Sequence, residues 1–398
     1  MSGASHGEHL TAKRVIPESP QRVSRSSLAG FLLGSAGMFA TMYATQAILP
    51  ELARDFDVSP AEAGLTVSAV VVAIAAGVWV WGPLSDRIGR RRSLLAASML
   101  LVAPTIGAAL APTFAVLVAC RALQGLCMPG LLAVGVPYVM EAFGPRLGGR
   151  AMGVYVSALV AGGLIGRVGV ALAAAAVGWR WAIGALAVLP LAGAAVMRRS
   201  LPDVGAPRRS GRRVVAQLRN LRVLRIAVAA GAMFFTFVGT FSYAVFRLER
   251  APFSYGNAVS SLIFLLWLLG AVGPFAGRVA DRIGWRRTAL TAVGVTAAGL
   301  ALTLPAVTPT FALGLALVTV SMFSGVTALQ LGLAAATSVD RGAASAVYFS
   351  VYYGAGAVGA YVPGLAWQAW RWPGVAVTSA CATALAAVSL LTLRSERA

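Results

Sequence analysis

The sequence predicts an all-α polytopic membrane protein with twelve transmembrane helices in two pseudo-symmetric six-helix bundles. Three observations support this fold class. Of the 398 residues, 58% are hydrophobic and only 12% are charged, the apolar residues form twelve long segments, and one charged motif occurs in each half. Because an average soluble protein has about 25% charged residues, this composition excludes an ordinary soluble chain.

The twelve apolar segments give the order of the elements. A backbone inside a bilayer must satisfy its own hydrogen bonds, so each segment is expected to be a helix. The 44 glycines supply the small side chains with which helices pack closely in lipid. The predicted spans are residues 28–49, 61–83, 93–111, 113–139, 149–175, 179–197, 225–247, 257–277, 287–305, 309–337, 344–368 and 373–393.

These segments divide the chain into five regions. Residues 1–26 are polar and are expected to be a disordered cytoplasmic tail. The N-terminal six-helix bundle is expected at 27–197 and the C-terminal one at 226–393, with a cytoplasmic C-terminus at 394–398. Between the bundles, residues 198–225 carry nine arginines and one acid. This basic cytoplasmic linker is expected to be a solvated loop with part of an amphipathic surface helix, or alternatively a site for anionic membrane lipids.

The net charge of +20 reports topology rather than a nucleic-acid partner. With a cytoplasmic N-terminus, the tail, the even-to-odd connections and the C-terminus hold 26 of the 33 basic residues, and the opposite side holds five. Cytoplasmic loops of membrane proteins are enriched in basic residues. We therefore expect a multi-pass protein of the cell inner (plasma) membrane with both termini in the cytoplasm.

A charged motif repeats after the second and the eighth span. Its first copy reads Gly82-Pro-Leu-Ser-Asp86-Arg87-Ile88-Gly89-Arg90-Arg91-Arg92. The second, 195 residues later, reads Gly277-Arg-Val-Ala-Asp281-Arg282-Ile283-Gly284-Trp285-Arg286-Arg287. Such a repeat at matching positions predicts two parallel six-helix units. Gly82 and Gly89 are expected to allow a tight connection and close helix approach.

This motif resembles the signature loop of the major facilitator superfamily, and with the twelve spans the resemblance covers residues 27–393. It implies that Asp86 latches a cytoplasmic gate against the eleventh helix and that Asp281 does so against the fifth. Alternatively, the charges only anchor the loop by the positive-inside rule. The implied latch residues are Gly82, Asp86, Arg87, Gly89, Arg90, Asp281, Arg282, Gly284, Arg150 and Arg341.

Arg121 lies inside the fourth predicted span. Because a charge within the membrane is costly, it is a functional hypothesis by default. Together with Gln124 and Gly125 it is similar to the family's arginine, two residues, glutamine, glycine motif, which is associated with proton coupling. Alternatively, Arg121 is a structural arginine that satisfies backbone carbonyls.

Arg167 ends the run Gly162-Gly163-Leu164-Ile165-Gly166-Arg167 in the fifth span. Drug antiporters of the superfamily carry a glycine-rich motif here that usually ends in glycine-proline. The arginine form is similar to a small bacterial subgroup of multidrug and acriflavine-resistance type efflux proteins. Alternatively, Arg167 extends its side chain to the outer boundary of the membrane.

None of the thirteen acids falls at the middle of a span. If transport is proton-coupled, the titrating group is expected to be Asp86 or Glu141, although Glu141 is also placed for a salt bridge with the basic loop. The spans contain no histidine, no cluster of metal ligands and no nucleophile beside a base. We therefore expect no enzyme activity, no metal and no cofactor.

The central cavity is expected to be lined by aromatic, methionine and amide side chains, which suit an amphipathic, mainly neutral or anion-tolerant solute. The candidates are Tyr43, Gln46, Gln124, Tyr155, Phe235, Tyr243, Trp267, Met322, Gln330, Tyr348 and Tyr352.

These expectations combine into a monomeric secondary active transporter that works by alternating access. The favoured substrate class is amphipathic drugs or small metabolites, exported with protons as coupling ion. One alternative is an uptake carrier in which Arg121 and Arg167 bind an organic anion. An alternative from another class is a membrane receptor that transports nothing.

Overall fold

The computed structural model describes residues 25–203, 217–337 and 341–393, and within these ranges the chain is helical with short connections and no strand. Residues 1–24 of the predicted tail, residues 204–216 of the predicted linker and all of the predicted C-terminus therefore lie outside the described residues. Of the tail, the last two residues already belong to the first helix. Of the linker, the end forms the start of α11, so the second bundle begins before residue 226.

The first bundle contains a broken first helix and several long ones. Its elements are α1 (Arg25–Tyr43), η1 (Gln46–Ile48), α2 (Leu49–Asp55), α3 (Pro60–Ile88), α4 (Arg90–Ala109), α5 (Phe114–Cys127), α6 (Pro129–Leu164), a π-helical turn η2 (Ile165–Gly169), α7 (Val170–Val177), α8 (Trp179–Ala185) and α9 (Val188–Ser200). A capping box begins α3: the Ser59 hydroxyl accepts from the Glu62 backbone amide, and the Glu62 carboxylate accepts from the Ser59 backbone amide.

The second bundle repeats this order with fewer breaks. Its elements are α11 (Leu221–Leu248), α12 (Asn257–Ser261), a 3₁₀ segment η3 (Leu262–Val272), α13 (Gly273–Ile283), α14 (Trp285–Leu302), α15 (Thr308–Ala336) and α16 (Arg341–Leu391). At the start of α11, the Asn220 side chain accepts from the amides of Arg222 and Val223. This side-chain cap explains why the helix begins inside the predicted linker.

All twelve predicted spans fall on helices of the described chain. Within the described residues, nine helices are long and apolar enough to cross a membrane, and there are ten if the pair Asn257–Val272 and Phe275–Ile283, bent by 45°, counts as one span. The 18-residue α14 covers the ninth predicted span. α16 covers the last two spans, because Arg371 has a φ of 54° and a ψ of −138° that break it into two helices.

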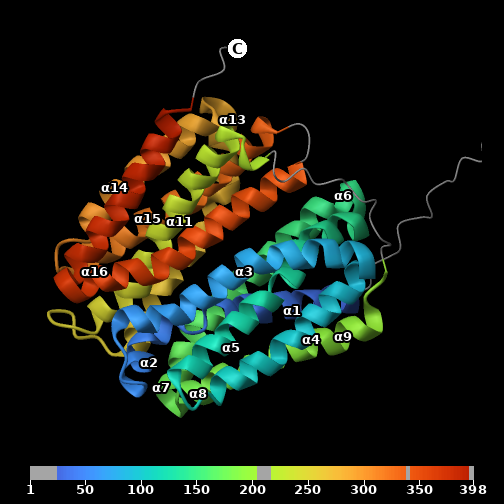
Figure 1. Cartoon of the computed structure of the whole chain (residues 1–398), viewed down its shortest axis with the longest axis horizontal. Coiled ribbons are helices and arrows are strands. Elements are labelled where there is room, and N and C mark those ends of the chain that lie inside the picture. Colours follow the sequence, from blue (N-terminus) through green and yellow to red (C-terminus); the bar gives the residue numbers. More distant parts are fainter. Residues whose placement is uncertain (1–24, 204–216, 338–340, 394–398) are drawn as a thin grey trace, which may run out of the picture.

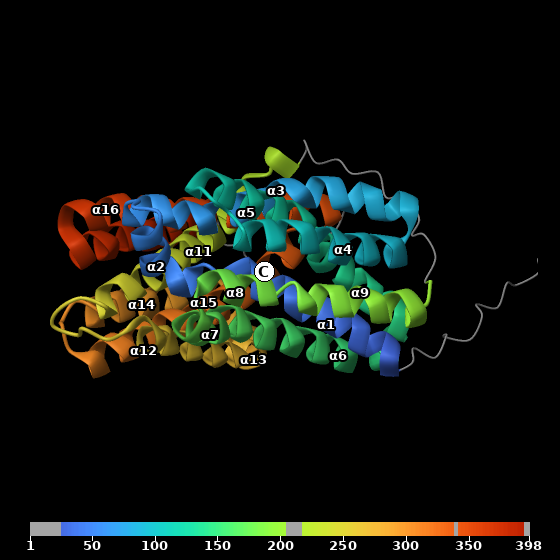
Figure 2. The same cartoon turned by 90° about the horizontal axis from the view of Figure 1, so that it is seen from below.

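The helices pack into two bundles that meet along α3 and α16. Within the first bundle, α1 packs against α6 and α9, and in the second α11 packs against α16 and α14 against α15. Figure 1 shows the two sets of ribbons converging near α2 and drawing apart toward α6 and α13. The turned view places α16, α3, α5 and α4 in one layer and α12, α13, α7 and α6 in another (Figure 2), so each bundle contributes to both layers.

The end of the molecule near α2 joins the bundles, and we call it the closed end. There Arg54 Nη1 lies 2.8 Å from Glu249 Oε2 of the other bundle. The Tyr243 hydroxyl of α11 donates to the carbonyl of Ala360 at 2.7 Å and to that of Pro60, on the first bundle, at 3.4 Å. A side chain from each bundle thus crosses to its partner at this end.

The opposite end, here the basic end, is defined by the arginines of the two motif copies. A glycine makes each tight turn: Gly89 between α3 and α4 has a φ of 89°, and Gly284 between α13 and α14 has a φ of 88°. Only glycine adopts such a conformation without strain. Gly82, expected to share this duty, lies instead within the helical run of α3, so this expectation was wrong.

Each turn is followed by an arginine that closes its own bundle. Arg91 donates to the carbonyls of Leu201 and Arg198 at 2.7 and 2.8 Å, at the end of α9. Arg286 donates to the carbonyls of Leu390 and Leu391 at 2.9 Å each, at the end of α16. The last carbonyls of a helix lack amide partners and carry partial negative charge, so a guanidinium stabilises them.

Candidate functional site

A cavity of about 300 Å³ lies between the two bundles. The first bundle supplies its wall from α1, α6 and η2, and the second from α11, η3, α15 and α16. Aromatic and aliphatic side chains dominate, and no aspartate or glutamate is among the described residues that line it. The wall consists of Phe39, Tyr43, Val156, Leu159, Val160, Gly163, Leu164, Arg167, Phe234, Phe237, Trp267, Met322, Phe323, Val326, Thr327, Gln330, Tyr352 and Tyr353.

Arg167 is the charged residue in this wall, and its side chain is almost fully buried at 1% exposure. The guanidinium carbon lies 3.6 Å from the ring centre of Tyr43 and 3.4 Å from that of Trp267. Because Tyr43 belongs to the first bundle and Trp267 to the second, the cation is held between rings of both. Aromatic faces attract a cation through their quadrupole, more strongly where water is excluded.

Glycines bring Arg167 to this position. A side chain on Gly162 would strike the backbone of Ala36, and one on Gly166 would strike that of Ala40. Glycines four residues apart thus let α6 and the π-helical turn η2 lie directly against α1. Arg167 directly follows Gly166, and this places its side chain beside Tyr43 of α1.

Two of the guanidinium nitrogens have partners. Nε donates to the side-chain oxygen of Gln46 at 3.0 Å, and Nη1 donates to the carbonyl of Gly163 at 2.9 Å. The Gln46 amide in turn donates to the Ser242 hydroxyl of α11 at 3.1 Å. Nη2 is buried and has no hydrogen-bond partner among the residues that the structure describes. The arginine is therefore part of a polar chain between the bundles and retains one unused donor.

Arg121 lies outside the cavity wall, within the first bundle, and is 1% exposed. Its guanidinium donates to the carbonyls of Thr41 and Met42 at 2.6 Å each and to that of Thr66 at 3.0 Å. It also donates to the Gln124 side chain at 2.7 Å. Since α1 ends at Tyr43, the carbonyls of its last turn lack the amides of a continuing helix. This geometry fits the structural alternative, and a role in proton coupling stays a prediction.

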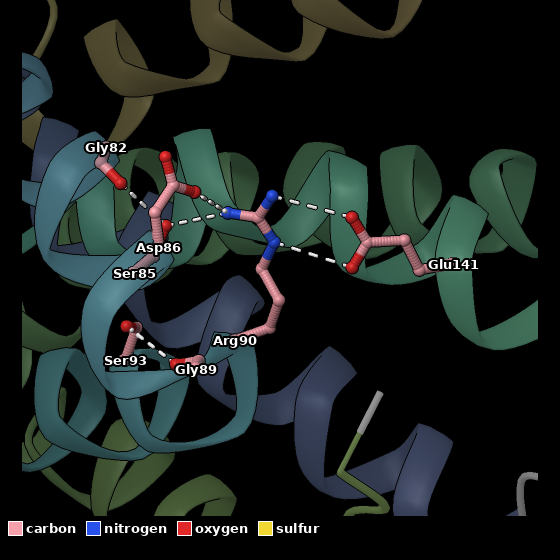
Figure 3. A network of polar contacts seen from close by, with 7 residues as sticks. All are labelled: Gly82, Ser85, Asp86, Gly89, Arg90, Ser93 and Glu141. Atoms are coloured by element: carbon pink, nitrogen blue, oxygen red, sulfur yellow. Dashed lines mark hydrogen bonds and ion pairs between the residues drawn. The ribbon is translucent and has the colours of Figure 1, made fainter. Parts of the chain in front are cut away.

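A cluster of charges lies at the basic end of the first bundle (Figure 3). Arg90, with a side chain 10% exposed, lies 3.3 Å from Asp86 Oδ1 and 3.4 Å from Glu141 Oε1. It also donates to the Ser85 hydroxyl at 2.7 Å. Its Nε and Nη2 both approach the Glu141 carboxylate, so the contact is bidentate. The salt bridge expected for Glu141 is thus present, and it joins α6 to the turn after α3.

The structure leaves the predicted gate latch untested. Asp86 contacts Arg90, four residues further along the chain, and the described ion pairs of the basic end all lie within the first bundle. The side chains of Arg150 and Arg341 lie outside the described residues. Arg87 lies in the last turn of α3, and Asp281 and Arg282 lie in the last turn of α13 before Gly284. A latch between the bundles therefore remains a prediction.

Of the eleven predicted cavity residues, five line the cavity: Tyr43, Trp267, Met322, Gln330 and Tyr352. Gln46 is buried next to it, bonded to Arg167. Tyr348 stacks on Tyr352 and lines an adjoining hollow of about 280 Å³ that shares Gln330 with the cavity.

The other four predicted residues lie elsewhere. Gln124 packs inside the first bundle, where it contacts Arg121 and Thr105, and Tyr155 also lies there, stacked on Phe31. Tyr243 belongs to the closed end. Phe235 lines an apolar hollow between α11 and α16. These four assignments to the cavity wall were wrong, because the helical phase of each side chain is not visible in an apolar segment.

Several cavity residues escaped the sequence analysis, and the aromatic face of α11 is the instructive case. Phe234 and Phe237 line the cavity, and Phe241 continues their row beside Trp267. The spacing of three and four residues marks one face of a helix. That spacing would have chosen Phe234 over its neighbour Phe235. No such spacing pointed to Phe323, which lines the cavity, or to Ser242, which accepts a hydrogen bond from Gln46 beside it.

Larger hollows lie on the outer surface of the second bundle. One of about 740 Å³ lies between α14 and α16, and one of about 590 Å³ lies between α11 and α16. Both are lined by a single bundle and by almost wholly apolar side chains. They lack the convergent polar groups of a solute site, so the smaller cavity between the bundles is the better candidate.

Comparisons with known proteins agree with this architecture. A family model described as Major Facilitator Superfamily matches residues 31–360. The chain is 28% identical over 365 residues to an uncharacterized MFS-type transporter, YybF, of Bacillus subtilis (strain 168), covering 89% of each. It is 31% identical over 288 residues to the inner membrane transport protein YnfM of Escherichia coli (strain K12), covering 70% of this chain and 69% of that one.

Solved structures resemble the fold at low sequence identity. A crystal structure of the nucleoside transporter NupG superposes with a TM-score of 0.75 at 12% identity, covering 92% of this chain and 99% of that one. A bacterial homologue of the human lysosomal transporter Spinster, in an inward-facing and occupied conformation, gives a TM-score of 0.68 at 13% identity and covers 92% and 93%.

Proposed function

Because the chain belongs to the major facilitator superfamily, we propose that it exports small amphipathic molecules across the plasma membrane by alternating access, coupled to protons. One observation carries the proposal: the cavity between the bundles has an aromatic and methionine wall supplied by both. A site at the junction of two bundles changes its exposure when the bundles rock. Aromatic and methionine side chains suit amphipathic solutes of varied shape. Export in particular draws on the resemblance of 162–167 to efflux proteins.

We assign the basic end to the cytoplasm, because arginines of both motif copies gather there. The closed end is then periplasmic, with the Arg54–Glu249 ion pair as part of its gate. In this assignment the protein is a monomer with both termini in the cytoplasm, and alternation requires this ion pair to break.

For proton coupling we propose the cluster of Asp86, Arg90 and Glu141. It supplies carboxylates at the boundary of the membrane, whereas no described carboxylate lines the cavity. Protonation of either acid would weaken its attraction to Arg90. The family's latch would then pair Asp86 with the start of α16, near Arg341, and Asp281 with α6, near Arg150. In the second motif copy, Gly284 would correspond to Gly89 and Arg282 to Arg87.

The test is a flux assay in proteoliposomes with an imposed pH gradient and a trapped pH dye. A panel of amphipathic compounds is expected to include some that speed the loss of the gradient. Glu141→Gln and Asp86→Asn are expected to reduce this effect severalfold, whereas Arg219→Gln, an exposed linker residue, should not. Compound transport without any proton movement would contradict coupling, and no flux of any compound would favour a receptor.

The latch has its own measurement. Asp86→Asn is expected to shift the balance between conformations, because a neutral amide binds Arg90 or a helix end more weakly than a carboxylate. Single cysteines introduced at each gate report this shift through their rate of labelling. Unchanged labelling at both gates would leave the cluster as a loop anchor only.

Uptake of an organic anion is the second candidate function, and the buried charge of Arg167 favours it. The direction of transport separates it from export. Vesicles of known orientation would accumulate the anion in one case and expel it in the other.

A further inference from the structure

The unused donor of Arg167 is the starting point. The guanidinium is 1% exposed, its Nη2 has no partner, and none of the described ion pairs includes it. The rings of Tyr43 and Trp267 lie 3.6 and 3.4 Å from the guanidinium carbon and stabilise its charge, but neither residue accepts a hydrogen bond from Nη2. A buried charge with an unsatisfied N–H is costly, so the cavity wall is incomplete as it stands.

A second donor in the same wall is also unsatisfied. Trp267 Nε1 is buried and has no partner, and an indole nitrogen can only donate. The Tyr348 hydroxyl, beside the adjoining hollow, is buried and unpartnered as well. The cavity wall thus offers donors and a positive charge, while no described carboxylate faces them. What is missing is an acceptor with negative charge.

The remainder of the wall limits what else the ligand can be. Phe234 and Tyr352 stack with ring centres 4.1 Å apart and 9° between their planes, so they form a parallel aromatic pair in the wall. Phe237 and Met322 continue the apolar wall. A cavity of about 300 Å³ is at the small end for ligand sites. An inorganic anion would leave these apolar walls without contacts, whereas a planar apolar group would cover them.

We propose that the cavity binds a small organic anion whose carboxylate accepts from Arg167 Nη2 while its planar apolar body packs against the aromatic wall. The inference rests on the proposed transport function and specifies its substrate class. Nε and Nη1 of Arg167 are already engaged by Gln46 and Gly163, so the ligand receives one nitrogen rather than a bidentate pair. Trp267 Nε1 is the second donor available to the carboxylate.

The test compares carboxylates with their neutral amides. The full chain in detergent is titrated calorimetrically with benzoate and benzamide, naphthalene-1-acetate and its amide, and indole-3-acetate and its amide. Within each pair the shape is nearly constant and the charge differs. The carboxylate of at least one pair is expected to bind at least about tenfold more tightly than its amide, as charge-assisted hydrogen bonds are stronger.

Variants locate the effect. Arg167→Gln should remove the preference for the carboxylate, and Arg167→Lys should retain part of it. Trp267→Phe keeps an aromatic ring but loses the donor and should weaken carboxylate binding about threefold or more, and by a larger factor than amide binding, because a hydrogen bond to a charged acceptor is the stronger one. The matched controls are Arg219→Gln and Trp181→Phe, two exposed positions away from the cavity. If Arg167→Gln does not fold, judged by thermal melting, the lysine and phenylalanine variants carry the test.

Three results would overturn the inference: equal affinity within every pair, a preference that survives in Arg167→Gln, or no binding of any carboxylate. Each is separable from failure of the proposed function. If neutral amphipathic compounds still move in proteoliposomes, transport stands and only the anion assignment falls. If the carboxylates bind through Arg167 but nothing crosses the membrane, the anion site stands and the transport proposal falls.

Discussion

The two motif copies at the basic end agree in architecture and differ in chemistry. Gly89 and Gly284 have φ values of 89° and 88°, and the following arginines, Arg91 and Arg286, each cap the last helix of their own bundle. Between glycine and capping arginine, however, the first copy has Arg90 and the second has Trp285. The two copies thus share the turn glycine and the capping arginine, and they differ in the residue between them.

This difference extends through the two halves. Arg90 is paired with Asp86 and Glu141, while position 336, which matches Glu141 by the same offset, is an alanine. Trp285 instead packs against Gly332. Both intramembrane arginines, Arg121 and Arg167, belong to the first half, whereas the second supplies most of the aromatic cavity wall. The first half therefore provides the positive charge of the cavity wall, and the second half provides most of its aromatic side chains.

The largest effect is expected at Arg121, which has no counterpart in the second half because the matching residue is Ala316. Arg121→Leu removes one hydrogen-bond donor from each of three carbonyls and from the Gln124 oxygen. Even at the modest value of hydrogen bonds inside membranes, this should cost about 3 kcal/mol in the free energy of unfolding. Denaturant titration in micelles measures it, with the exposed Leu123→Ala as control. A loss below about 1 kcal/mol would mean that the first half does not depend on its buried cation.

Exchanging the differing residue is the second test. Arg90→Trp copies the second motif into the first and removes the shared partner of Asp86 and Glu141. The indole would also face position 137, a proline, where Trp285 faces Gly332. We expect a loss of about 2 kcal/mol, since two partly buried carboxylates lose their cation. The reciprocal Trp285→Arg should cost less, and equal costs would show that the two motifs are interchangeable.

The shared feature gives a smaller and symmetric expectation. Arg91→Gln and Arg286→Gln each remove a cap from helix-end carbonyls, which is worth about 1 kcal/mol. The two losses should agree within about 0.5 kcal/mol and should add in the double variant, because the sites lie in different bundles. Thermal and denaturant unfolding of the three variants would measure this. A loss confined to one variant would break the symmetry inferred from the geometry.

The smallest effect is expected at the closed end. Arg54→Gln removes the ion pair with Glu249, but the Arg54 side chain is 64% exposed, so the free energy of unfolding should fall by only about 0.5 kcal/mol. Labelling of a cysteine placed nearby should nevertheless become faster, because the pair joins the two bundles. Unchanged labelling would assign the closure to Tyr243 and its carbonyl partners alone.

The fold was predictable because it depends on local patterns. Long apolar segments, basic connections and the repeated motif predicted twelve spans, and each of them falls on a helix of the described chain. The breaks within them were not predictable, since they depend on contacts from other helices. The end of α1 at Tyr43 is stabilised by Arg121 of α5, and η3 follows an ordinary apolar run, 262–272, that carries no sign of a 3₁₀ conformation.

The site was predictable only in part. A charge inside an apolar segment is conspicuous, so Arg167 was identified at once, and so were Tyr43 and Trp267 as aromatic candidates. Their stacking was not, because Trp267 is distant in the sequence and comes from the other bundle. The link from Gln46 to Ser242 crosses 196 residues for the same reason. The residue types in the sequence indicated a cationic and aromatic site, but only the tertiary contacts show which of these residues lie together in it.

The capping arginines have a consequence for how the chain can be divided. Arg91 fixes the point where the polypeptide leaves the first bundle, and Arg286 does the same for the second, so each set of six helices contains the contacts that close it. This independence means that two separately expressed halves should reassemble in one membrane.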